Sequence, residues 1–227
     1  MEIPKSSRYE IKMQTEPLML PQLRSWLRVH SSGFYKPYAD RQVNNVYFDT
    51  PYLGSFGENL AGVSGRRKTR LRWYGKEMNN IQATLEIKCK RNLHGWKDSQ
   101  SLSRQLNLYD TSWVDLIKSI RDRLKPNIQS HLDSACWPVM LNHYQREYYL
   151  SFDAKVRITI DFSQVVYDQT LYAFPNLSFS TPLADKVVIE VKGNKIHHRR
   201  IAEIIAEIPL QVSKHSKYAS GMEAIFF

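Results

Sequence analysis

The sequence contains little cysteine and no long hydrophobic segment. Its 227 residues include two cysteines, Cys89 and Cys136, and neither has the closely spaced Cys and His neighbours of a metal site. No apolar stretch approaches the roughly 18 residues needed to cross a bilayer, and residues 1–5 do not begin a secretion signal. These absences predict reduced thiols and a cytoplasmic location.

Acidic residues are also in short supply. The chain has 32 Lys and Arg against 22 Asp and Glu, which gives a formal net charge of +10. Such a surplus predicts a polyanionic partner, which could be nucleic acid, anionic lipid or a phosphate chain. Because no repeat, low-complexity tract or linker divides the sequence, we expect a single domain over residues 1–227.

Segments rich in β-branched and aromatic residues alternate with amphipathic segments along the chain. Strands are expected at residues 8–13, 43–48, 68–74, 84–90, 144–152, 156–161 and 186–192. Pro51 should end the second of these, since proline donates no ladder hydrogen bond. Helices are expected where apolar residues recur at helical spacing, at residues 20–27, 113–124 and 201–208. Ser112 should cap the second helix, and Pro126 and Pro209 should end the second and third.

Charged residues occupy one face of several expected strands. Residues i and i+2 of a strand point to the same side, so Arg70 and Arg72 share a face while Leu71 and Trp73 share the other. The same alternation occurs in four more segments: Glu10 and Lys12; Glu86, Lys88 and Lys90; Arg157, Thr159 and Asp161; Glu190 and Lys192. In any one strand, the pattern is typical of the solvent-facing side of an antiparallel sheet.

The recurrence of this pattern favours an α+β fold with a closed antiparallel β-barrel, helices packed outside and charges inside. The faces opposite the charges are almost purely apolar, and the expected helices supply apolar surface to cover them. A barrel of about eight strands can hold one elongated ligand. Like charges in its interior require a counter-charge, which a triphosphate or polyphosphate would provide. The glutamates would then hold a divalent cation bridging phosphate oxygens.

Two strand motifs carry a resemblance to a known family. At RLRWYG (residues 70–75), followed by LEIK (residues 85–88), the chain resembles the VTC domain. This is the catalytic domain of the vacuolar transporter chaperone polyphosphate polymerases, within the CYTH and triphosphate tunnel metalloenzyme superfamily. Supporting motifs follow in the family's order: RYEIK (8–12), VYFDT (46–50), YQR (144–146), VRI (156–158), VIEVK (188–192) and SKHSKY (213–218).

The resemblance implies a metal-dependent polyphosphate polymerase that transfers the γ-phosphate of ATP to a growing polyphosphate chain. The catalytic side chains would be Lys12, Arg70, Arg72, Lys88 and Glu190. The four basic residues among them would contact phosphate. The other expected phosphate contacts are Lys97, Tyr144, Arg146, Arg157, Lys214, Ser216 and Lys217. Glu190 and Glu10 would hold the metal, manganese or magnesium. Lys97 competes with Arg104 for the family's basic position after Lys88, and residues 66–68 are interpreted as a loop or turn.

Two other functions stay open. One is a tunnel-fold hydrolase of tripolyphosphate, thiamine triphosphate or an RNA 5′-triphosphate. Hydrolytic members of the superfamily begin with Glu-x-Glu-x-Lys, whereas this chain has Arg8 at the first position, which favours the polymerase. The other is a non-catalytic polyphosphate-binding or nucleic-acid-binding module. Trp73 falls opposite the arginines, which disfavours base stacking, so no specific nucleic acid is expected. The expected partners are ATP, triphosphate and polyphosphate, and export of a product would need a membrane partner protein.

Overall fold

A computed structural model describes residues 9–91 and 94–227 of the chain. Arg8, expected to begin the first strand, lies outside the described residues. The contacts divide the chain into two compact units. Unit 1 comprises residues 1–41, 144–164 and 184–216, and unit 2 comprises residues 42–143, 165–183 and 217–227. The expectation of a single domain stays a prediction.

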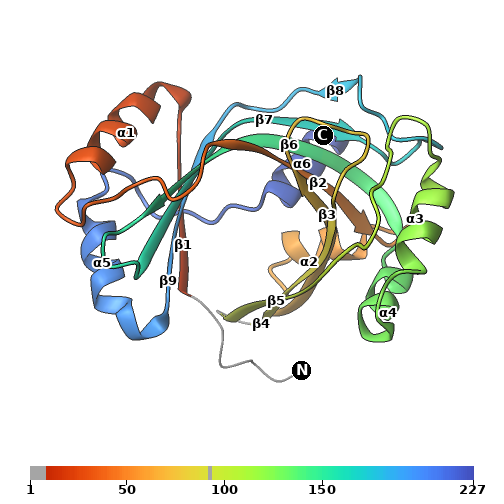
Figure 1. Cartoon of the computed structure of the whole chain (residues 1–227), viewed down its shortest axis with the longest axis horizontal. Coiled ribbons are helices and arrows are strands. Elements are labelled where there is room, and N and C mark those ends of the chain that lie inside the picture. Colours follow the sequence, from red (N-terminus) through yellow and green to blue (C-terminus); the bar gives the residue numbers. More distant parts are fainter. Residues whose placement is uncertain (1–8, 92–93) are drawn as a thin grey trace. The chain divides into compact units, whose positions relative to one another are not determined.

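Unit 1 is a set of antiparallel strands packed against two helices. Its strands are β1 (Tyr9–Thr15), β9 (Val187–Gly193) and the adjoining parts of β6 (Trp137–Leu150) and β7 (Val156–Asp168). Its helices are α1 (Leu20–Val29) and α5 (His198–Glu207), with short 3-10 turns η1 (Pro17–Met19) and η2 (Lys195–His197) before them. Apolar side chains of β1, β7 and β9, such as Met13, Ile158 and Ile189, form one core with those of α1 and α5. These helices therefore cover the apolar face of the strands (Figure 1).

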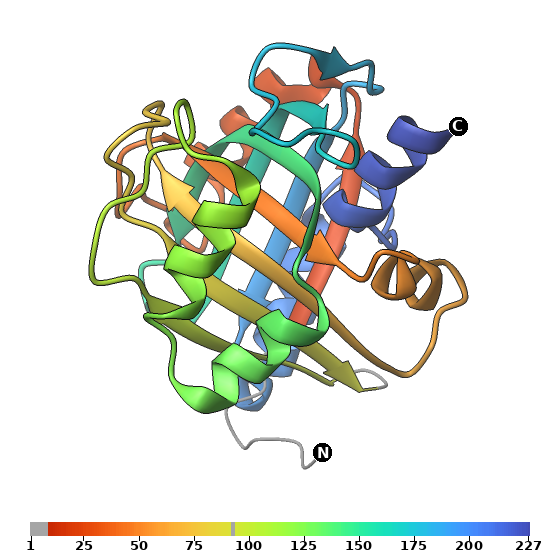
Figure 2. The ribbon, with the colours of Figure 1, turned by 90° about the vertical axis from the view of Figure 1, so that its right-hand side faces the viewer.

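Unit 2 contains the strands that carry the arginine motif. They are β2 (Arg41–Asp49, shared at its first residue with unit 1), β3 (Gly65–Tyr74), β4 (Thr84–Arg91) and β5 (His94–Ser101). The short strand β8 (Ser180–Thr181) pairs with β7. The helices α3 (Trp113–Arg121) and α4 (Pro126–Ser134) cross the face of β3 and β4, as Figure 2 shows. Leu71, Trp73, Leu85 and Ile87 pack there against apolar residues of both helices and are almost fully buried.

A second apolar cluster of unit 2 involves the helices α2 (Gly54–Leu60) and α6 (Lys217–Phe226). Phe56 of α2 and Tyr218 and Met222 of α6 pack with Tyr47 of β2 and with residues of β6 and β7. Tyr47 and Val46 are neighbours on β2 and point to opposite sides of the strand, so this cluster lies on the side away from α3 and α4.

Hydrogen bonding orders the strands β1-β9-β7-β6-β2-β3-β4-β5. The structure thus confirms an α+β fold with an antiparallel sheet and helices packed on it. Because this order has β1 at one end and β5 at the other, closure into a barrel stays a prediction. No helix among residues 9–91 and 94–227 has the length and apolar character needed to cross a bilayer.

Three of the expected boundaries are confirmed and others differ. Helix α5 ends at Glu207, shortly before Pro209, as expected. Strand β2 ends at Asp49, as Pro51 predicted, and Ser112 caps α3 by accepting a hydrogen bond from the Asp115 backbone N–H. Pro126 begins α4 instead of ending α3. Proline lacks a backbone N–H, and the first N–H groups of a helix have no intrahelical acceptor, so proline is tolerated in the first turn. Residues 66–68 belong to β3, so the expectation of a loop was wrong.

Candidate phosphate-binding site

The face of β3, β4 and β5 that points away from α3 and α4 is densely basic. Its side chains alternate with the buried apolar residues of the same strands. The basic members are Arg66, Lys68, Arg70, Arg72, Lys88, Lys90 and Lys97. We call this set the basic face. It includes four residues expected at the site, Arg70, Arg72, Lys88 and Lys97, and it confirms the expected alternation of Arg70, Arg72 and Lys88 with core residues.

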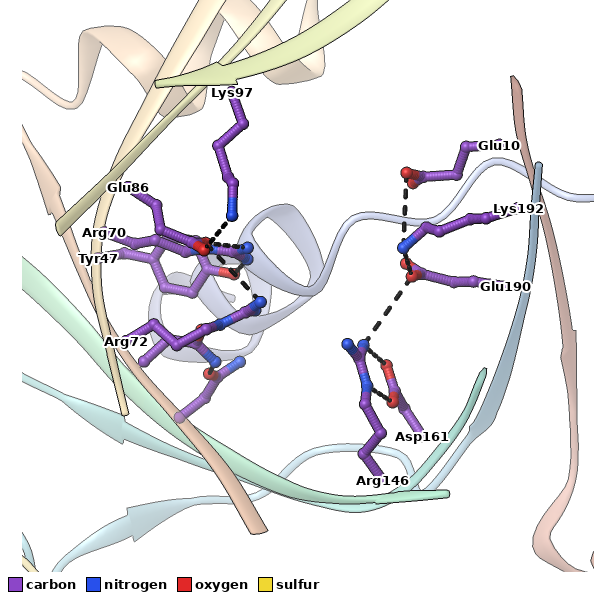
Figure 3. A network of polar contacts seen from close by, with 12 residues as sticks. Glu10, Tyr47, Arg70, Arg72, Glu86, Lys97, Arg146, Asp161, Glu190 and Lys192 are labelled. Atoms are coloured by element: carbon purple, nitrogen blue, oxygen red, sulfur yellow. Dashed lines mark hydrogen bonds and ion pairs between the residues drawn. The ribbon is translucent and has the colours of Figure 1, made fainter. Parts of the chain in front are cut away.

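Glu86 lies at the centre of the basic face. The Arg70 guanidinium donates through Nε and Nη2 to Glu86 Oε2 at 2.8 and 2.6 Å, and Lys97 Nζ donates to Oε1 at 2.7 Å (Figure 3). Arg72 Nη1 lies 3.7 Å from Oε2. Burial of the carboxyl acts to raise its pKa, but the attraction of Arg70, Arg72 and Lys97 outweighs this and lowers the pKa of Glu86 to about 2. Glu86 is therefore an ionised internal counter-charge at neutral pH.

Beyond Glu86, cations stand directly opposite one another across the strands. Lys68 pairs in register with Lys88, Lys88 pairs with Lys97, and Arg66 pairs with Lys90. Directly opposed like charges destabilise a sheet. An anion bound along this face would turn the repulsion into attraction.

Polar side chains of β2 extend the basic face. Asn45 Oδ1 accepts from Arg72 Nε at 2.8 Å and its Nδ2 donates to Asn142 at 2.8 Å. The Tyr47 hydroxyl lies 3.4 Å from Arg70 Nη1. The arginines are thus held by fixed partners, which positions their guanidinium groups before any ligand arrives.

Unit 1 carries a second polar cluster on the face of β1, β7 and β9 opposite α1 and α5. Lys12 Nζ lies 3.2 Å from Glu190 and 3.5 Å from Glu10, and it donates to the His215 carbonyl at 3.1 Å. Lys192 forms ion pairs with the same two glutamates (Figure 3). Burial acts to lower the pKa of Lys12, but the attraction of Glu190 and Glu10 outweighs it and raises that pKa above its ordinary value.

Arg146 joins this cluster through Asp161. Its Nε and Nη2 donate to the two carboxylate oxygens at 2.5 and 2.6 Å, and Nη2 lies 3.9 Å from Glu190. The guanidinium also lies over the Tyr144 ring, 5.3 Å from its centroid. Burial disfavours the charged form, yet Tyr144, Asp161 and Glu190 together raise the pKa of Arg146 well above its usual range. Arg146 is therefore a fixed cation in this cluster.

The remaining expected residues have different surroundings. Arg157 pairs in register with Lys192, and its buried Nε has no hydrogen-bond partner in the described part of the chain. Lys214 is exposed and Ser216 is half-buried in the segment that follows Ser213, whose N–H donates to the Lys12 carbonyl. Lys217 is buried and begins α6. The phosphate contacts of these residues stay predictions.

The carboxylates expected to bind metal, Glu190 and Glu10, share the two ammonium groups of Lys12 and Lys192. Within residues 9–91 and 94–227, no group of three or more His, Cys, Asp or Glu side chains is arranged as a metal site. Two carboxylates still fit Mg²⁺, which usually takes one or two from a protein and completes its coordination with phosphate oxygens and water. A metal ion would have to displace the Lys12 and Lys192 ammonium groups from Glu10 and Glu190.

The two clusters also contain residues to which the sequence analysis gave no site role. Lys68 and Tyr47 lie on or beside the basic face, Glu86 is its internal counter-charge, and Asp161 fixes Arg146 in unit 1. Lys68 and Asp161 follow the same two-residue alternation that identified Arg70 and Arg157, so the signal was available. Tyr47 gave none, because a tyrosine within an apolar strand is typical of a core position.

The fold resembles two solved structures of low sequence identity. One is a proposed adenylate cyclase from Vibrio parahaemolyticus, with a TM-score of 0.51 and 11% identity over 96% of this chain and 97% of that one. The other is the PH1819 protein from Pyrococcus horikoshii OT3, with a TM-score of 0.50 and 12% identity over 93% and 97%. No curated protein matches the chain in sequence. The VTC domain model matches residues 6–226, and the chain therefore belongs to the VTC domain family.

Proposed function

We propose that this chain binds triphosphate and polyphosphate on the basic face and polymerises polyphosphate from ATP. The observation that carries this proposal is the opposition of cations across β3, β4 and β5, where Lys68, Lys88 and Lys97 face one another in register. A phosphate chain presents negative charge at regular intervals and would neutralise such a row. Arginine grips phosphate bidentately and lysine adds a compact charge.

Membership of the VTC domain family supports phosphoryl transfer as the reaction. In the proposed step, an oxygen of the terminal phosphate of the growing chain attacks the γ-phosphorus of ATP. A new P–O bond forms, the bond from that phosphorus to the β–γ bridging oxygen breaks, and ADP leaves with the electron pair. Arg70 and Arg72 would neutralise charge on the transferring group, and positioning with electrostatic stabilisation supplies most of the rate in such transfers.

A divalent cation, manganese or magnesium, would be held by Glu190 and Glu10 and would neutralise phosphate oxygens when bound. Arg157 offers further support for an anionic ligand in unit 1, since a phosphate oxygen would satisfy its buried Nε. We further propose that the sheet closes into the tunnel typical of this superfamily, that the protein acts in the cytoplasm, and that any export of product uses a membrane partner.

The test is incubation with ATP and manganese, followed by separate assays for polyphosphate and free phosphate. Polymer formation is expected, and it should fall strongly in Arg70→Ala. The matched control is Arg121→Ala, which removes an arginine paired with Asp133 on the outer surface of α3. Free phosphate without polymer would instead identify a hydrolase. Tripolyphosphate binding without either product would identify a non-catalytic module.

A further inference from the structure

Tyr218 connects the start of α6 to the basic face. Its ring stacks on Tyr47, with centroids 5.0 Å apart and an interplanar angle of 24°. The Lys68 ammonium lies 5.7 Å from the centroid of the same ring, which is within the range of a cation–π interaction. Lys217 precedes Tyr218 directly. One ring therefore contacts or adjoins Tyr47, Lys68 and Lys217.

A buried carboxylate holds Tyr218 in this place. The phenol hydroxyl donates to Asp49 Oδ2, and both residues are almost fully buried. Asp49 also accepts three backbone hydrogen bonds at the turn into α2, from Thr50 and Ser55 at Oδ1 and from Phe56 at Oδ2. The carboxylate is thus fixed by the backbone, and Tyr218 is tied to a rigid point.

We propose that Tyr218, held by Asp49, is a positioning residue that places Lys68 and Lys217 for phosphate binding. The inference rests on the proposed function, because it assumes that the basic face binds phosphate. Lysine has a flexible stem and loses much rotamer freedom when it binds. A ring beneath Lys68 and a tethered backbone at Lys217 reduce that loss. The entropic cost of ordering the two lysine side chains is then smaller, and phosphate affinity is higher.

The experiment compares tripolyphosphate affinity of the wild type and Tyr218→Phe by calorimetry. The substitution keeps the ring and leaves Asp49 its three backbone donors, so the variant should fold. We expect affinity to fall about fivefold, within the range of coupling between residues in contact. The matched control is Tyr149→Phe. This change also removes a buried phenol–carboxylate hydrogen bond, to Glu147 at 2.7 Å, but in the core of unit 1, and it should leave affinity unchanged.

A double-mutant cycle separates positioning from general destabilisation. In a background that carries Lys68→Ala and Lys217→Ala, Tyr218→Phe should change affinity by less than about twofold, because the residues through which it acts are gone. An unchanged fivefold effect in that background would overturn the inference. So would wild-type affinity in Tyr218→Phe itself. If the wild type binds no tripolyphosphate, the proposed function fails and this inference fails with it.

Discussion

Replacing Glu86 by Gln should weaken the fold and strengthen phosphate binding. The carboxylate is the internal counter-charge of Arg70, Arg72 and Lys97, and its side chain is 6% exposed. Its pKa falls from 4.5 to about 2. At 1.36 kcal/mol per pKa unit, ionised Glu86 contributes about 3 kcal/mol to the free energy of unfolding at neutral pH. Glu86→Gln should lose most of this contribution.

The pH dependence follows from the sign of this shift. Because the pKa is lower in the folded chain than in the unfolded chain, the contribution is fully present above about pH 4.5 and is lost as the pH falls toward 2. The difference in unfolding free energy between the wild type and Glu86→Gln should therefore be constant from pH 5 to 8 and smaller at pH 3. Urea unfolding of both proteins at pH 7 and at pH 3 measures this difference.

The same variant should bind tripolyphosphate more tightly. Glu86 competes with phosphate for Arg70 and Lys97, so removing its charge should raise affinity about tenfold, or about 1.4 kcal/mol. Glu203→Gln is the control, because it removes a similar charge from an exposed position on α5. Equal unfolding free energies of wild type and Glu86→Gln at pH 7 would refute the ion-pair argument. Lower stability with unchanged affinity would refute the competition with phosphate.

Three further outcomes are expected. Glu190→Gln should abolish metal-dependent turnover and leave tripolyphosphate affinity largely intact. Turnover rates across a manganese titration and tripolyphosphate affinity from calorimetry test this, and wild-type turnover in the variant would show that Glu190 is not part of the site. Tripolyphosphate at 100 times its dissociation constant should stabilise the fold by about 2.7 kcal/mol, and an unchanged melting temperature would contradict anion binding. Gly193→Ala should cost about 1–3 kcal/mol by overpacking, since its Cβ would lie 2.7 Å from Ile201 Cδ1 and 2.9 Å from the Lys155 carbonyl; denaturant unfolding measures it.

The strands and their charged faces could be predicted because the alternation is local. Neighbouring side chains of one strand point to opposite sides. Arg70 and Leu71 therefore identify a charged face and an apolar face even when the partner strand is unknown. The core residues of α1 and α5 followed from helical spacing for the same reason. The pairing register, in contrast, depends on other strands. That Lys88 lies opposite both Lys68 and Lys97 appears only once the strands are paired.

Helix α6 and the role of Tyr218 could not be predicted because they depend on close packing. The segment is rich in small residues, and its position on β6 and β7 requires Gly221, where an added Cβ would collide with Met140 Sδ and approach Val166. Pro51 predicted the end of the strand that closes at Asp49. The hydrogen bond that Asp49 accepts from a tyrosine 169 residues later has no local signal.

The two polar clusters differ in charge balance, and this difference suggests different parts in the proposed reaction. In unit 1, the ion pairs set Lys12, Lys192 and Arg146 against the carboxylates of Glu10, Glu190 and Asp161. Arg157 adds one further positive charge there, so unit 1 attracts an anion less strongly than the basic face does unless a cation enters with it. In unit 2, Glu86 faces several cations, and an anion is attracted without metal. Affinity for a metal-free phosphate chain should therefore depend on the basic face, whereas metal dependence should depend on the glutamates of unit 1.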